Sequence, residues 1–217
     1  MHNIRSLMAT GALAVLLAST TAGCMAPVQA VNAIEQSAAR HDLDQGIAVL
    51  RAHIRTLQDK GDPLGDYFYA LGNSDGWITD VTDPKAITAL FEKAAARGSM
   101  DAKILLALQV AMNQTIPGQL DRYKVPSRDL TQWEQGLARL LPLLQQQCNV
   151  RRLVIDMGKP RVKYYSIAYE VWPVFRDGYY RYNSDGSRTL LRDPVRQKAW
   201  ESLDNQCPTP QEEWLDR

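Results

Sequence analysis

Three cysteines, Cys24, Cys148 and Cys207, are the residues whose chemistry is most clearly defined by their surroundings. A cysteine thiol can accept a lipid, or it can pair with a second thiol as a disulfide in an oxidising compartment. Cys24 follows five small residues, and these follow the apolar stretch Leu7 to Ala18. Its surroundings therefore differ from those of the other two cysteines, and different chemistry is expected there.

The first 23 residues have the composition of an export signal. Arg5 is their only charged residue, and the apolar stretch is too short for a permanent membrane-spanning helix. The run Thr21-Ala22-Gly23-Cys24 resembles the bacterial lipobox, in which small residues precede a cysteine that is lipidated and becomes the first mature residue. Residues 1–23 are thereby expected to be a lipoprotein signal peptide. Leucine usually stands where this chain has Thr21, so ordinary cleavage after Gly23 or Ala30 is the alternative.

If Cys24 carries a lipid, the two remaining cysteines form an even pair in an oxidising compartment. We therefore predict a disulfide between Cys148 and Cys207. It would close a loop of about 60 residues, for which chain entropy gives roughly 4 kcal/mol of stabilisation. The alternative is that Cys148 and Cys207 are two unrelated buried thiols.

The charge of the chain bears on its partners. Removing residues 1–23 from the 217 leaves 194, with Lys+Arg reduced from 25 to 24 against 24 Asp+Glu. A net charge of zero does not favour nucleic acid, which attracts basic surfaces. No second apolar stretch approaches the length of a membrane span, so membrane attachment is expected through the N-terminal lipid only.

Side chains for catalysis or metal binding are not grouped in recognisable motifs. After signal removal the histidines are His41 and His53, whose separation of twelve residues does not bring them to one metal ion. We find no nucleophile elbow, phosphate-binding glycine loop or zinc-peptidase motif. We therefore expect no catalytic, cofactor or metal site, and the protein is not expected to be an enzyme.

Residues 33–147 should be helical, after a tether over residues 24–32. Asp42 is predicted to cap a helix whose apolar side chains recur every three or four residues as far as Leu57. Asp83-Pro84 should begin a second helix, which runs to Gly98. A further helix should follow Asp129 and bend at Pro142.

A family resemblance lies in residues 94–107. Paired alanines, Ala94-Ala95, precede Gly98, and Ala102 and Leu106-Ala107 follow it. This pattern resembles the Sel1-like repeat, a relative of the tetratricopeptide repeat. A second, degraded copy lies around Gly61, 37 residues earlier. The resemblance implies short antiparallel helix pairs, packed closely through small residues. The alternative is an ordinary helical bundle.

Residues 148–217 are predicted to form an aromatic-rich cap, tied to the helices by the disulfide. Ten of the chain's 17 aromatic residues lie from Tyr164 onward. The spacing of Tyr165, Tyr169 and Trp172 predicts a helix. Asn183 to Gly186 is a turn signal, so a small β-hairpin is expected around it.

Part of this cap is also a candidate partner-binding surface, because exposed tyrosine and arginine side chains make good interface anchors. The candidate residues are Tyr179, Tyr180, Arg181 and Tyr182. We expect them to form a junction with the helix at residues 101–113. The alternative is that these aromatic residues pack in the core of the cap.

Short Sel1-like lipoproteins resemble, among others, immunity proteins that protect a bacterium from antibacterial effectors delivered into its periplasm. The resemblance implies a lipid-anchored envelope protein that faces the periplasm and binds a protein partner, such as a secreted toxin. Met25 after the lipid-bearing cysteine favours the outer membrane. The alternatives are an envelope assembly or scaffolding lipoprotein and an envelope hydrolase with an unrecognised site.

Overall fold

The computed structural model describes residues 7–117, 130–156, 158–166, 178–207 and 212–215. This part of the chain is mostly helical, as the sequence predicts, and it also contains a small three-stranded antiparallel sheet that the sequence does not predict. The helices are α1 (Leu7–Asp59), α2 (Pro63–Ser74), α3 (Pro84–Ala96), α4 (Met100–Ala111), α5 (Leu130–Gln146) and α7 (Pro194–Gln206). The strands are β1 (Asn149–Asp156), β2 (Lys159–Ser166), β3 (Tyr179–Tyr182), β4 (Arg188–Leu191) and β5 (Glu213–Trp214).

Two helix pairs, α1–α2 and α3–α4, are joined by turns of the same construction. Gly61 and Gly98 adopt positive φ angles of 71° and 107°, which other residues rarely take. In each turn, the amide of the residue after the glycine donates a hydrogen bond to the carbonyl of the residue four positions before the glycine. These bonds join Asp62 to Leu57 (2.9 Å) and Ser99 to Ala94 (3.0 Å). These bonds form the Schellman motif that ends many helices. The corresponding glycines of the two copies of the sequence pattern, Gly61 and Gly98, therefore both form turns.

The helices begin at capping side chains. Asp83 accepts a hydrogen bond from the amide of Ala86, and Pro84 occupies the first turn, so the predicted start of α3 is confirmed. Ser99 caps α4 in the same way by accepting from the amide of Ala102. The predicted capping residue Asp129 lies outside the described residues.

Helix α1 is longer than the sequence predicts. Asp42 lies inside α1 and does not begin a helix, so that prediction is wrong. Residues 33–59 contain no proline and include several alanines, which favour continuation of a helix over interruption. The predicted tether, residues 24–32, lies within the same helix.

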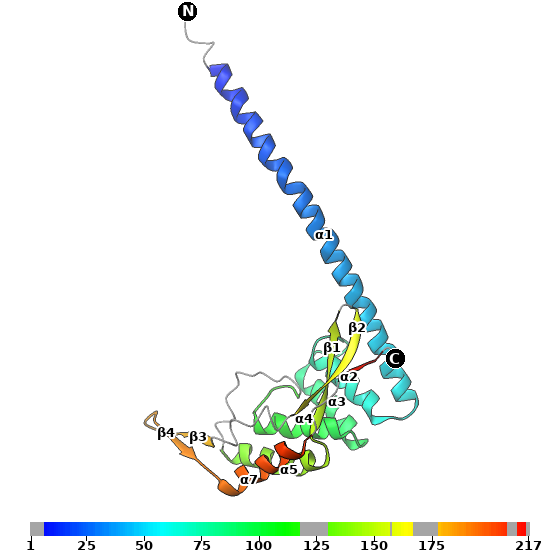
Figure 1. The fold of residues 1–217 in the computed structure, drawn as a ribbon, viewed down its shortest axis with the longest axis vertical. Helices are drawn as coiled ribbons and strands as arrows, with labels where there is room; N and C mark the ends of the chain where they lie inside the picture. Colours follow the sequence, from blue (N-terminus) through cyan, green and yellow to red (C-terminus); the bar gives the residue numbers. More distant parts are fainter. Residues whose placement is uncertain (1–6, 118–129, 157, 167–177, 208–211, 216–217) are drawn as a thin grey trace, which may run out of the picture.

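The N-terminal part of α1 extends away from the rest of the structure (Figure 1). Residues 31–45 are all exposed, and Gly46 is the first buried residue after them. There the hairpin of β1 and β2 packs on the helix, so that a Cβ on Gly46 would lie 2.6 Å from Ile155 Cγ2. None of the described helices has both the length and the apolar composition that a membrane crossing requires.

One apolar core joins the helices to the sheet. Its largest fully buried side chains come from all six described helices, with Trp200 of α7 the bulkiest. Gly136 of α5 faces the backbone of Ala111 in α4, and a Cβ at position 136 would overlap it. Helices α4 and α5 therefore approach closely at this point.

The sheet has the strand order β1–β2–β5, with both pairings antiparallel. Strands β1 and β2 pair along their whole length, from Asn149 opposite Ser166 to Asp156 opposite Lys159. Tyr165 lies in β2 and not in a helix, so the helix predicted from its spacing does not begin there. Tyr169 and Trp172 lie outside the described residues.

The predicted β-hairpin in the cap is confirmed by the pairing of β3 with β4. Tyr179 lies opposite Leu191, and Tyr182 lies opposite Arg188. The turn between them closes with a hydrogen bond from the amide of Gly186 to the carbonyl of Asn183, 3.1 Å long.

The structure joins Cys148 and Cys207 in a disulfide. Cys148 follows α5 and Cys207 follows α7, so the bond links the C-terminal ends of these two helices. This is the pairing that cysteine parity predicts.

Candidate functional site

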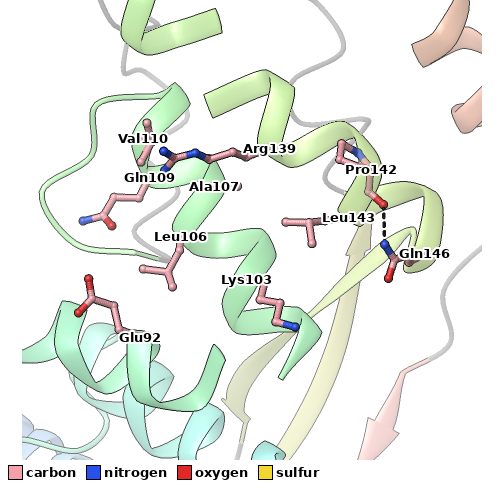
Figure 2. A pocket seen from close by; sticks show the side chains of 10 residues that line it. All are labelled: Glu92, Lys103, Leu106, Ala107, Gln109, Val110, Arg139, Pro142, Leu143 and Gln146. Atoms are coloured by element: carbon pink, nitrogen blue, oxygen red, sulfur yellow. Dashed lines mark hydrogen bonds between the residues drawn. The ribbon is translucent and has the colours of Figure 1, made fainter. Parts of the chain in front are cut away.

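A groove of about 610 Å³ lies between α3, α4 and α5 (Figure 2). Its apolar lining comes from two helices: Leu106, Ala107 and Val110 of α4, and Pro142 and Leu143 of α5. Leucine and valine side chains that remain accessible to solvent in a concave site can be covered by a binding partner.

Charged side chains border this apolar lining. Glu92 belongs to α3, Lys103 to α4 and Arg139 to α5. Within the described part of the chain, none of these three side chains makes a hydrogen bond or an ion pair. Their charges are therefore available to groups that enter the groove.

Two amides complete the lining, and both are held by the protein. Gln109 Nε2 donates to the carbonyl of Thr115 at 3.2 Å, and Gln146 Nε2 donates to the carbonyl of Pro142 at 3.2 Å.

The groove-forming helices are fixed to the sheet by a buried ion pair. Asp101, in the first turn of α4, accepts from the backbone amide of Arg151 at 2.8 Å and from its guanidinium Nη1 at 2.6 Å. Tyr67 of α2 donates its hydroxyl to the carbonyl of the same arginine. Both backbone groups of Arg151 on the free edge of β1 are therefore satisfied by side chains, where a neighbouring strand would otherwise be needed.

A second carboxylate, Asp66 of α2, binds two cations at the C-terminal end of α3. Asp66 is 4% exposed and receives Lys93 Nζ at 3.3 Å and the guanidinium of Arg97. Arg97 Nη2 also donates to the carbonyl of Gly61 at 3.2 Å. These contacts connect α3 to the α1–α2 turn, so the cluster has a structural role.

Asp75 and Arg152 form a further ion pair between the end of α2 and β1, with Oδ1 and Nη2 3.0 Å apart. Both side chains are 14% exposed. Burial raises the pKa of Asp75 to about 6, and the neighbouring Arg152 offsets only part of this effect.

The raised pKa of Asp75 predicts a pH-dependent contribution to stability. Because the folded-state pKa of about 6 exceeds the ordinary value of 3.8, the contribution is complete below pH 3.8 and is lost as the pH rises through 6. The relevant quantity is the unfolding free energy of the wild type minus that of Asp75→Asn. We expect this difference to be larger at pH 4 than at pH 7.5 by roughly 2 to 3 kcal/mol. Urea denaturation of both proteins at the two pH values measures this difference; a difference that does not change with pH contradicts the prediction.

The predicted partner-binding residues lie away from the groove. Tyr180 of β3 is 49% exposed, whereas the side chains of Tyr179, Arg181 and Tyr182 lie outside the description. None of the four lines the groove, and the junction expected between residues 101–113 and the hairpin is not part of it. The second wall beside α4 comes from α5 instead.

A smaller cavity of about 310 Å³ lies where α5, β4 and α7 meet. Leu191 and Arg192 line it from the hairpin side, and Trp133 lines it from α5. The guanidinium carbon of Arg196 is 5.3 Å from the centre of the Trp133 ring, a cation–π geometry. The hairpin is therefore next to α5 and α7.

The histidines and acidic residues do not meet at a metal-binding site among the described residues. His41 lies within hydrogen-bond distance of Gln45, and the ring of His53 is 6.1 Å from the ring of Phe68. Cys24 lies in α1, and its side chain is outside the description.

The groove was not predicted from the sequence, and its α5 residues differ from the apolar residues of that helix that are buried in the core, namely Trp133, Leu137, Leu140 and Leu144. The signal was present, because residues 139, 142, 143 and 146 repeat the spacing of residues 103, 106, 107 and 110. Each set lies on one face of its helix. Two such stripes indicate a groove only when their helices are known to be neighbours.

Comparison with known proteins returned no match: no protein-family model, no curated protein and no solved structure corresponds to this chain.

Proposed function

We propose that this chain is a periplasm-facing bacterial lipoprotein that binds a protein partner through the groove between α3, α4 and α5. The observation that carries the proposal is the composition of this groove, with accessible leucine and valine side chains in its lining and unpaired charges at its border. Protein interfaces have this arrangement, an apolar centre with a polar rim.

The proposed partner is a secreted antibacterial effector, and the chain would act as its immunity protein. Support comes from the Sel1-like residue pattern around Gly98 and from the two turns of equal construction 37 residues apart. Repeated helix pairs offer continuous binding surfaces.

Attachment to the outer membrane would occur through a lipid on Cys24, with the rest of the chain facing the periplasm. If α1 remains helical in the mature protein, it places about 30 Å of helix between Cys24 and Gly46, where packing begins. That length would hold the groove clear of the lipid headgroups.

Replacement of the lipid acceptor tests the anchor. We expect Cys24→Ala to abolish metabolic labelling with a fatty-acid analogue and to move the protein from the membrane fraction to the soluble fraction, because one thiol carries the attachment. The matched control is Cys148→Ser, which should keep its label. Unchanged labelling of Cys24→Ala would exclude lipidation at this residue.

Replacement of Leu106 tests the groove. Leu106→Asp places a charge at the centre of the proposed interface, and we expect it to weaken partner capture at least about tenfold. Ala52→Asp, on an exposed position of α1 away from the groove, is the matched control and should leave capture unchanged. The baits are soluble Cys24→Ser proteins, and equal denaturation midpoints must first show that the Leu106 variant folds.

The captured protein decides between two functions. A toxin encoded beside this gene, together with loss of self-protection in cells that carry Leu106→Asp, supports the immunity function. A resident envelope protein captured through the same residue identifies a scaffold instead. Equal capture by wild type and Leu106→Asp would contradict binding in the groove.

A further inference from the structure

The charges and apolar residues of the groove are arranged in a regular order along its two long walls. Helix α4 presents Lys103, then Leu106 and Ala107, then Val110, and all four positions lie on one helical face. Helix α5 presents Arg139, then Pro142 and Leu143, then Gln146, at the same spacing. Each wall therefore begins with a cation that is followed by an apolar pair.

The two walls run in opposite directions. The C-terminal end of α4 contacts the N-terminal half of α5, because Ala111 lies against Gly136. The N-terminal end of α4 lies near the end of α5, because Asp101 bonds to Arg151, five residues after α5 ends. The two cations are therefore near opposite ends of the groove, and Figure 2 shows Arg139 beside Val110 with Lys103 farther along α4.

Neither side chain is neutralised within the described part of the chain; Lys103 is half-buried and Arg139 is exposed. By contrast, the buried carboxylates of Asp66 and Asp101 and the half-buried carboxylate of Asp75 are paired. Glu92 is the acidic residue of the lining, and it lies on the third helix, α3. Charge complementarity thus favours an occupant with a carboxylate near each end of the groove and apolar side chains between them.

We infer that the groove binds an amphipathic helix in which two adjacent apolar residues are bracketed by acidic residues, one three positions before the pair and one three positions after it. The two acidic positions are then about 10 Å apart along the helix axis, which matches the length of α4 from Lys103 to Val110. The apolar pair would pack on Leu106 and Leu143, and the acidic residues would face Lys103 and Arg139. This inference rests on the proposed function, because it names the kind of protein surface that the groove takes.

Synthetic peptides test the inference with the soluble Cys24→Ser protein. The first is a helical peptide with an adjacent leucine pair and a glutamate at each bracketing position. The second has lysine in place of both glutamates, and the third has the same composition as the first with the glutamates on the opposite helical face. We expect the first to bind about tenfold more tightly than the second at low salt, with the third weaker than the first.

Charge reversal in the protein completes the test. In the double variant Lys103→Glu/Arg139→Glu, the preference between the two peptides should invert: the lysine peptide should bind more tightly than the glutamate peptide. Arg55→Glu/Lys85→Glu changes the net charge equally at exposed positions outside the groove, and it should keep the wild-type preference. All the substitutions are on accessible side chains, and denaturation midpoints check that each variant folds.

Equal affinity for the three peptides, or a preference that survives charge reversal in the groove, would overturn the inference. If no peptide binds while Leu106→Asp still abolishes capture of a protein partner, this occupant is wrong and the proposed function stands. If partner capture is also insensitive to Leu106→Asp, both fail.

Discussion

Replacing Asp101 with alanine should lower the unfolding free energy by about 3 to 5 kcal/mol, one of the two largest effects expected for this chain. The Asp101 carboxylate is 1% exposed, and it satisfies both the backbone amide and the guanidinium of Arg151. Its loss would leave a half-buried cation and an edge-strand amide without their acceptor. Urea denaturation of the wild type and the variant measures the change.

Two further variants separate burial from charge. Asp101→Asn keeps an oxygen acceptor for the amide of Arg151 but removes the charge. We therefore expect its unfolding free energy to lie between those of the wild type and Asp101→Ala. Asp80→Ala removes a carboxylate that binds Arg51 at 2.8 Å with side chains 34% and 41% exposed, and it should cost less than about 1 kcal/mol. If Asp101→Ala costs no more than Asp80→Ala, the proposed role of Asp101 is wrong.

Loss of the disulfide should have a comparable effect. Cys148 and Cys207 are 59 residues apart, and opening a loop of that length is expected to cost roughly 4 kcal/mol, because the unfolded chain gains conformational freedom. We expect Cys148→Ser/Cys207→Ser to lower the denaturation midpoint accordingly, in a soluble Cys24→Ser background. Adding a reductant to the wild type should lower its midpoint to that of the double variant.

The double variant is its own control, because a reductant should not change its midpoint. Alkylation of the unreduced protein gives an independent measurement, in which neither Cys148 nor Cys207 should react. Modification of both residues before reduction would show that the disulfide does not form, and equal midpoints for wild type and variant would show that it does not stabilise the fold.

Local signals in the sequence predicted several helix boundaries and turns correctly. Asp83-Pro84 begins α3, Gly61 and Gly98 form the turns, and the β3–β4 hairpin closes at Gly186. Each depends on the conformational preferences of one or two residues and needs no distant contact. The same kind of signal failed at Asp42, because a capping residue acts only where the chain before it leaves the helix.

Strands β1 and β2 could not be predicted in this way. Their sequences contain Arg151, Arg152, Arg161 and Lys163, which do not give the clear alternation of a half-buried strand. These cations are accommodated by carboxylates from other parts of the chain, namely Asp101, Asp75 and Glu212. Partners separated by 49 residues or more carry no local signal.

The groove likewise depends partly on local sequence and partly on contacts between distant segments. Helical spacing in the sequence alone determined that residues 103, 106 and 110 share one face of α4 and that residues 139, 143 and 146 share one face of α5, and the cysteine count made Cys148 and Cys207 an even pair. Only the tertiary structure decided that these two faces line one cavity, because the close approach at Gly136 and the Asp101–Arg151 pair fix how α5 lies beside α4. Helical periodicity is a property of each segment, whereas a binding groove is a property of the packing between segments.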